Sequence, residues 1–175
     1  REANIVVDKL DAVAISKGPG SYTGLRIGVS SAKGLCYAAN KPLIAISTLE
    51  ALAHQVKEEE GVIIPMLDAR RMEVYSAVFD TNHSQIRETQ AQILEANIFD
   101  QYLEASKVYF IGNGVEKAKE IIDHKNAVFI ENKLPSANEM SSLSYTKYKK
   151  SDIEDVAYFE PFYLKDFMAP LPKRK

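Results

Sequence analysis

The sequence predicts an α/β fold built from a duplicated unit, of which the first copy is only partly present. From Gly61 onward the hydrophobic pattern runs β-β-β-α-β-α-β-α. The residues before it run β-α-β-α, which is the second half of the same unit. The hydrophobic fraction of 46% over 175 residues is typical of a packed core, in one domain or two small lobes. An ordinary α/β domain without duplication is the alternative interpretation.

The first half begins with an apolar run, a glycine-rich loop and a long helical pattern. Pro42 precedes a second apolar run, and Ser47 suits the N-cap of a second helix, with Glu50 three residues later to close a capping box. The long helix places apolar or small side chains on one face, at Leu25, Val29, Ala32, Cys36 and Ala39. The predicted elements are a strand over residues 10–16, a helix over 23–40, a strand over 43–46 and a helix from 47 to about 57.

The second half opens with two strands, over residues 62–67 and 73–79, joined by the turn Asp68-Ala69-Arg70-Arg71. The elements that follow are a strand over 85–91, a helix over 96–105, a strand over 107–111, a helix over 115–123, a strand over 127–130 and a helix over 137–149. The chain therefore divides into residues 1–60, the remainder of an N-terminal lobe, residues 61–150, a C-terminal lobe, and residues 151–175, an aromatic strap that ties the lobes together and ends in a basic tail.

A complete first copy would need three strands and a helix upstream of Leu10. Residues 1–9 resemble the tail of a helix, and residue 1 is not methionine. We therefore expect that the front of the first lobe is missing from this chain, through truncation, proteolysis or disorder.

The glycine-rich stretch over residues 18–28 is the most informative local feature. A glycine-dense turn before a helix presents free backbone N–H groups at the positive end of the helix dipole, which suits a phosphate or a carboxylate. Its spacing is neither the dinucleotide fingerprint nor a Walker loop. Ser21 and Thr23 suit helix caps, and Gly24 is expected to need a positive φ or a close backbone neighbour. The candidate loop residues are Gly18, Pro19, Gly20, Ser21, Tyr22, Thr23, Gly24 and Arg26.

As an eleven-residue string, this loop resembles the signature of the TsaB (YeaZ) family, partners of the TsaD enzyme in making threonylcarbamoyladenosine on tRNA. The likeness extends from Leu10 to Leu52 and is looser in the middle of the chain. It returns at Pro161-Phe162-Tyr163-Leu164-Lys165, where the family usually has Pro-x-Tyr-Leu-Arg. The resemblance implies the actin-like, ribonuclease-H-like duplicated fold (the ASKHA superfamily), in agreement with the order of elements.

The resemblance also implies a function, that of a non-catalytic scaffold that binds and activates TsaD. Its further partner would be TsaE, and tRNA would be contacted indirectly through the complex. The protein alone would form a homodimer. No cofactor would be bound tightly, and ATP or ADP would bind at the TsaD interface, near the glycine loop.

Two alternatives come from other classes of protein. The first is a glycoprotease-type peptidase, the historical label of relatives. The absence of a His-x-x-x-His motif counts against it. The second is a small-molecule kinase of the actin-like superfamily, which needs an acidic residue on a strand upstream of Leu10. Incubation with protein substrates and metal would test the peptidase, and an ATP turnover assay on the full-length protein, alone and with TsaD, would test the kinase.

Two further groups of residues are candidate sites. Asp68 and Arg70 lie in the turn that, in actin-like ATPases, covers the nucleotide cleft; a plain hairpin tip is the alternative. Ser30, Lys33 and Tyr37 form a stripe on the long helix that is too mixed in character for a core. The resemblance favours a stripe that faces TsaD, or a second copy of the chain. Gly28 and Gly34 within the helix call for close packing.

Composition and charge exclude several classes of function. A net charge of −2 and a pI near 6.0 argue against a broad basic surface that grips RNA unaided. No apolar run is long enough for a membrane span, and a lone Cys36 indicates a buried thiol rather than a disulfide framework. The three histidines have no metal-ligand spacing, so no metal site is expected. The expected compartment is the cytoplasm.

Overall fold

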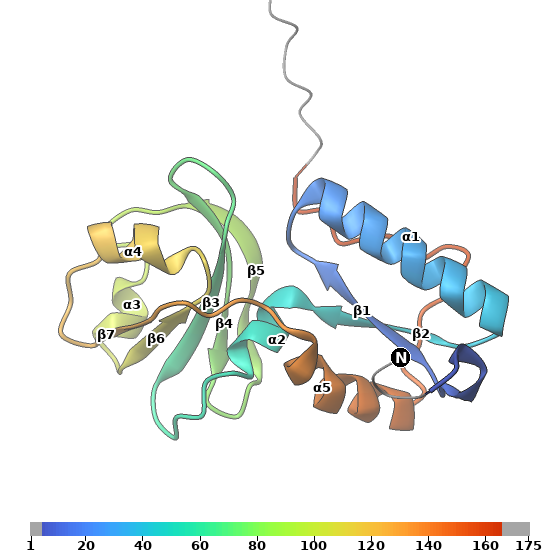
Figure 1. Cartoon of the computed structure of the whole chain (residues 1–175). Helices are drawn as coiled ribbons and strands as arrows, with labels where there is room; N and C mark the ends of the chain where they lie inside the picture. Colours follow the sequence, from blue (N-terminus) through green and yellow to red (C-terminus); the bar gives the residue numbers. More distant parts are fainter. Residues whose placement is uncertain (1–4, 166–175) are drawn as a thin grey trace, which may run out of the picture.

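The computed structural model describes residues 5–165, which form two β-sheets joined through helices (Figure 1). The smaller sheet holds two parallel strands, β1 (Val13–Gly18) and β2 (Leu43–Ser47). The long helix α1 (Tyr22–Ala39) connects them and packs against the sheet. One 3-10 turn, η1 (Val7–Lys9), precedes β1.

The larger sheet has five strands in the order β5-β4-β3-β6-β7. Its first three strands form an antiparallel meander, and β6 and β7 extend the sheet in parallel from β3. The bounds of these strands and their helices are β3 (Val62–Asp68), β4 (Glu73–Asp80), β5 (Gln85–Ile93), α3 (Asp100–Leu103), β6 (Val108–Ile111), α4 (Val115–Ile121) and β7 (Ala127–Ile130).

Two helices lie between the sheets and join their cores (Figure 1). The short helix α2 (Thr48–Ala53) is almost fully buried, and Leu49 belongs to the apolar cluster of the larger sheet. The helix α5 (Ala137–Lys149) packs instead against the smaller sheet, where Met140 meets the cluster around Ile44. The helix that follows each sheet thus covers the other sheet.

The order of elements confirms the duplicated α/β fold. The series β1-α1-β2-α2 repeats the series β6-α4-β7-α5, with parallel strands in both copies. In the larger sheet β6 lies between β3 and β7, whereas β1 pairs only with β2 within residues 5–165. The second copy therefore includes the three-stranded meander, and the first copy is represented by its last four elements.

Each strand and helix predicted from residue 10 onward occurs, but β1 lies two to three residues later than predicted and three helices are shorter, including α4, which ends at Ile121 rather than at residue 123. The helix after Ser47 ends at Ala53, where His54 is the C-cap: its backbone N–H and its ring Nδ1 both donate to the Glu50 carbonyl oxygen, the latter at 3.0 Å. Only residues 100–103 of the segment 96–105 form a helix. The helix expected over residues 1–9 appears as the turn η1, with residues 1–4 outside the described part.

The buried face of α1 is the one that the spacing predicts. Val29, Ala32 and Cys36 are buried and pack toward the β1–β2 sheet. Burial raises the pKa of the Cys36 thiol, which keeps it protonated and unreactive. Within residues 5–165, no helix combines the length and apolar character that crossing a membrane requires.

Candidate functional site

The glycine loop forms a capped helix start. Ser21 is the N-cap of α1, and its hydroxyl oxygen accepts from the Gly24 backbone N–H at 3.3 Å. This confirms the cap predicted for Ser21, whereas Thr23 lies inside the first helical turn and is exposed. Arg26, three residues later in α1, is also exposed.

The position that requires glycine is Gly18, not Gly24. Gly18 has φ +113°, and a Cβ there would lie 2.8 Å from the carbonyl oxygen of Phe162. Gly24 lies in the helix, where a Cβ would meet only the side chain of Ser21 at 3.4 Å. The expectation that Gly24 has a positive φ or a tight backbone neighbour is therefore wrong, because the close approach occurs where β1 ends.

The C-terminal strap, residues 152–165, holds this loop from outside. The Glu154 N–H donates to the Leu43 carbonyl oxygen at 2.8 Å, and the Phe162 N–H donates to the Lys17 carbonyl oxygen at 2.7 Å. The ring of Tyr163 stacks on that of Tyr22 with centroids 4.5 Å apart.

The last described residue of the strap reaches the larger sheet. The Lys165 ammonium forms an ion pair with the carboxylate of Glu73, at the start of β4. The strap thus contacts both sheets, and its contact with the larger sheet is made by Lys165 rather than by an aromatic side chain. The predicted basic tail lies outside the described residues.

Lys33 is part of this strap contact, which changes its predicted role. Its ammonium donates to the carbonyl oxygens of Ala157 at 3.1 Å and Phe159 at 2.9 Å. The predicted stripe of Ser30, Lys33 and Tyr37 is therefore split. Ser30 and Tyr37 are exposed, whereas the charge of Lys33 is used within the chain.

The hairpin between β3 and β4 is held by Asp68. Its carboxylate accepts from the Arg70 backbone N–H at 2.6 Å and from the Lys117 ammonium at 2.5 Å. Partial burial raises the pKa of the Asp68 carboxyl, but the bonds from Lys117 and Arg70 outweigh it and keep the pKa below its ordinary value. Arg70 and Arg71 both have positive φ, at 71° and 51°. Asp68 thus shapes the hairpin tip, and its predicted cleft role stays a prediction.

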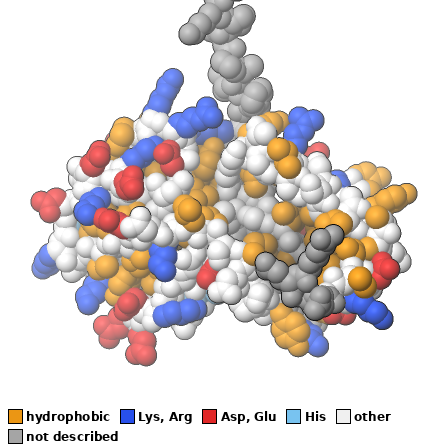
Figure 2. Space-filling view, in the orientation of Figure 1, with side chains coloured by type: hydrophobic (Ala, Val, Ile, Leu, Met, Phe, Trp, Pro, Cys, Tyr) orange, Lys and Arg blue, Asp and Glu red, His pale blue; other side chains and the backbone are white. Residues whose placement is uncertain are grey.

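The outer face of α1, away from the sheet, carries exposed apolar side chains. Ile27 is 63% exposed, Leu35 46% and Tyr37 87%. Gly34 lies among them, and a Cβ built there would have no heavy atom within 4 Å outside its own helix. Figure 2 shows hydrophobic side chains along the surface occupied by α1 in Figure 1. We call Ile27, Gly34, Leu35 and Tyr37 the outer α1 face.

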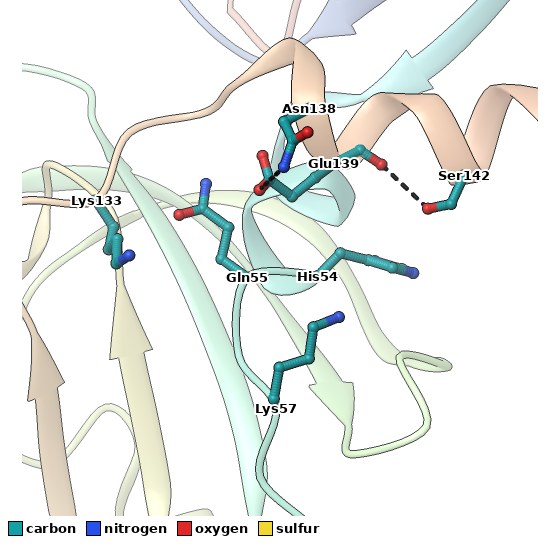
Figure 3. Close-up of a pocket in the computed structure, with 7 residues that line it drawn as sticks. All are labelled: His54, Gln55, Lys57, Lys133, Asn138, Glu139 and Ser142. Carbon is teal, nitrogen blue, oxygen red and sulfur yellow. Dashed lines mark hydrogen bonds between the residues drawn. The ribbon is translucent and has the colours of Figure 1, made fainter.

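A polar pocket of about 290 Å³ lies at the junction of α2 and α5 (Figure 3). Its lining residues are far apart in the sequence, and sequence reasoning missed it. It lies next to a stacked pair of imidazoles, His54 and His83, with centroids 4.1 Å apart. No group of three or more His, Cys, Asp or Glu side chains among the described residues could hold a metal ion.

The two sheets with their crossed helices define an α/β protein of the actin-like duplicated fold. The family model of the tRNA N6-adenosine threonylcarbamoyltransferase, TsaD, matches residues 1–171. The chain is 31% identical over 125 residues to the tRNA threonylcarbamoyladenosine biosynthesis protein TsaB of Bacillus subtilis, covering 70% of this chain and 55% of that protein. It is 28% identical over 168 residues to the TsaB of Escherichia coli, covering 91% and 73%.

Solved structures agree with these relatives. YeaZ from Pseudomonas aeruginosa superposes with a TM-score of 0.77 at 25% identity, over 93% of this chain and 78% of that one. A second Pseudomonas aeruginosa structure, described as an uncharacterized protein with similarity to peptidase YeaZ, has a TM-score of 0.81 at 24% identity, over 94% and 78% of the two chains. The chain belongs to the TsaB (YeaZ) family, within the group that the TsaD model describes.

Proposed function

We propose that this protein is a non-catalytic partner of TsaD in the threonylcarbamoyladenosine modification of tRNA. The names of its curated relatives place those proteins in this biosynthesis. The observation that carries the proposal for this chain is the outer α1 face. Large apolar side chains left in water on one helix are typical of a surface that another protein covers.

The shape of this face suits a partner helix. Gly34 leaves a gap between Ile27 and Tyr37 into which another backbone can approach closely. Glycine inside a helix costs about 1 kcal/mol relative to alanine, and no close contact at Gly34 among residues 5–165 compensates this cost. Tyr37 offers a large aromatic surface of the kind enriched in binding hot spots. TsaD would cover this face in the complex, and a second copy of the chain would cover it when TsaD is absent.

The remaining partners follow from the same arrangement. ATP or ADP would bind where the glycine loop meets TsaD, close to the exposed Arg26. TsaE would join the complex as a further protein, and tRNA would contact this chain only through it. No tightly bound cofactor is required.

The environment of the histidines supports a role without catalysis. The His54 ring donates to the Glu50 carbonyl oxygen, and the His83 Nε2 lies 3.1 Å from the Val56 carbonyl oxygen. The Nδ1 of His124 accepts from the Asn126 backbone N–H at 3.1 Å. Each imidazole thus forms a hydrogen bond with the backbone, whereas a hydrolase of the Ser–His or Cys–His type needs an imidazole paired with its nucleophile.

A substitution at Gly34 tests the proposal without disturbing the fold. Gly34→Glu adds a charged side chain where the described part of the chain has no atom close to the new Cβ, so the helix should be at least as stable as before. We expect its affinity for TsaD, measured by calorimetry, to fall at least tenfold, about 1.4 kcal/mol. Ala105→Glu, at an exposed position in the larger lobe, is the matched control. Native affinity of the Gly34→Glu variant would rule out the outer α1 face as the interface.

A further inference from the structure

The polar pocket between α2 and α5 has features of a ligand site that the proposed function does not use. Its lining comes from three segments: the end of α2 with the residues after it, the strand-to-helix connection before α5, and the first turns of α5. The volume of about 290 Å³ lies at the lower limit for small-molecule pockets, and therefore suits a small ligand.

One wall of the pocket is fixed by the stacked histidines. The His54 ring is oriented by its bond to the Glu50 carbonyl oxygen and by stacking on His83. His83 is in turn held by the Val56 carbonyl oxygen, from a position with φ 61° in the β4–β5 turn. Nδ1 of His54 is the donor to Glu50, and the His54 side chain lines the pocket. Lys57 follows directly on this wall, beneath His54 in Figure 3.

The opposite wall is fixed by Gln55 and by the start of α5. The Gln55 amide donates to the Leu134 carbonyl oxygen at 2.8 Å, which holds the connection that carries Lys133 against α2. The carboxylate of Glu139 accepts from the hydroxyl of its own N-cap, Ser136, and from the Asn138 amide at 3.4 Å. The only carboxylate of the lining is therefore already bonded within α5.

The two lysines of the lining, unlike Glu139, have no bonded partner among the described residues. Neither Lys57 nor Lys133 forms an ion pair with any described residue. The lining thus holds two ammonium groups against one bonded carboxylate. The Ser142 hydroxyl donates to the Glu139 carbonyl oxygen at 3.4 Å, whereas the side-chain amides of Gln55 and Asn138 each have a second N–H left for a ligand. Charge-assisted hydrogen bonds from such groups are the usual means of holding a phosphate.

We propose that this pocket binds a small phosphate, either free or as the phosphate group of a small monoester, attracted by the charges of Lys57 and Lys133 on its two sides (Figure 3). The site is separate from the glycine loop and from the outer α1 face. It joins helices of both lobes, so a bound phosphate would tie α2 to the start of α5.

The test is binding of phosphate to the full chain, measured by calorimetry and by changes in the NMR signals of the histidine rings. Inorganic phosphate and glycerol 3-phosphate are the two probes, and tighter binding of one identifies the source of the phosphate group. We expect saturable binding with a shift of the His54 signal. We expect at least a tenfold loss of affinity in the Lys57→Ala/Lys133→Ala variant, with an unchanged melting temperature.

The matched control is Lys125→Ala/Lys150→Ala, which removes the same charge at exposed positions outside the lining. It should bind both probes as the wild type does. Equal loss in both double variants would indicate non-specific screening and overturn the proposal. Binding that leaves the His54 signal unmoved, or no saturable binding of either probe, would also overturn it. None of these outcomes depends on TsaD, so the result is independent of the proposed function.

Discussion

Substitution of Gly18 by alanine tests how the strap holds the glycine loop. Gly18 has φ +113°, a conformation that an L-residue rarely adopts, at a cost of about 1–3 kcal/mol. The added Cβ would also lie 2.8 Å from the Phe162 carbonyl oxygen and 3.1 Å from a methyl carbon of Leu25. The strap must then move away from the loop, which weakens the bond from the Phe162 N–H to Lys17.

The expected effect is measurable by thermal unfolding. For a chain of this size, 1 kcal/mol corresponds to roughly 2–4 °C, so we expect the melting temperature of Gly18→Ala to fall by about 2–12 °C. Gly20→Ala is the control, because its Cβ would meet Leu25 only at 3.9 Å and the position has no positive φ. If the melting temperature of Gly18→Ala equals those of the wild type and of Gly20→Ala, the close contact between strap and loop does not exist in solution.

Three further predictions concern single side chains. Lys33→Met removes the ammonium that donates to Ala157 and Phe159, so it should lower the free energy of unfolding by about 1–2 kcal/mol and speed proteolysis within the strap. Lys150→Met is its control, and equal cleavage of both variants would contradict the contact. The lowered pKa of Asp68 contributes stability that is present above the ordinary carboxyl pKa of 3.8 and is lost as the pH falls through the lower pKa of the folded state. In denaturant titrations at a series of pH values, Asp68→Asn should lose this contribution to the pH dependence of the free energy of unfolding. A pH dependence equal to that of the wild type would refute it. Burial, with a smaller effect of His83, lowers the pKa of His54, so the unfolded state binds more protons and the free energy of unfolding should fall as the pH drops below the ordinary imidazole pKa of 6.5. His54→Asn should show a weaker pH dependence in this range, and a dependence equal to that of the wild type would argue against a lowered pKa of the half-buried His54 imidazole.

The fold was predictable where local signals agree with tertiary packing. The Ser47 cap and the polar turn after Asp68 are short-range signals, and the structure has both. The spacing of Ala32 and Cys36 identified the buried face of α1, because a helix that packs on a sheet repeats its apolar positions every three to four residues. The helix predicted over 96–105 was too long, since only residues 100–103 form regular turns.

The details of the site depended on contacts between distant residues. Lys33 reads as a surface charge, yet it bonds to carbonyl groups 124 and 126 residues later in the chain. The need for glycine at Gly18 arises from Phe162, which no local pattern indicates. His54 and His83 have ordinary surroundings in the sequence, and only the folded chain stacks them beside a pocket. Long-range contacts of this kind require the topology before they can be inferred.

The account is tested most directly by reconstituted threonylcarbamoyl transfer to tRNA with purified components. We expect no modified adenosine with this chain alone, and modification when TsaD and the remaining components of the reaction are present. Under the same conditions the Gly34→Glu variant should lose at least nine-tenths of the increase in tRNA modification that the wild-type chain gives with TsaD, while Ala105→Glu retains this increase. Modification by the chain without TsaD, or full stimulation by Gly34→Glu, would contradict a non-catalytic partner that acts through the outer α1 face.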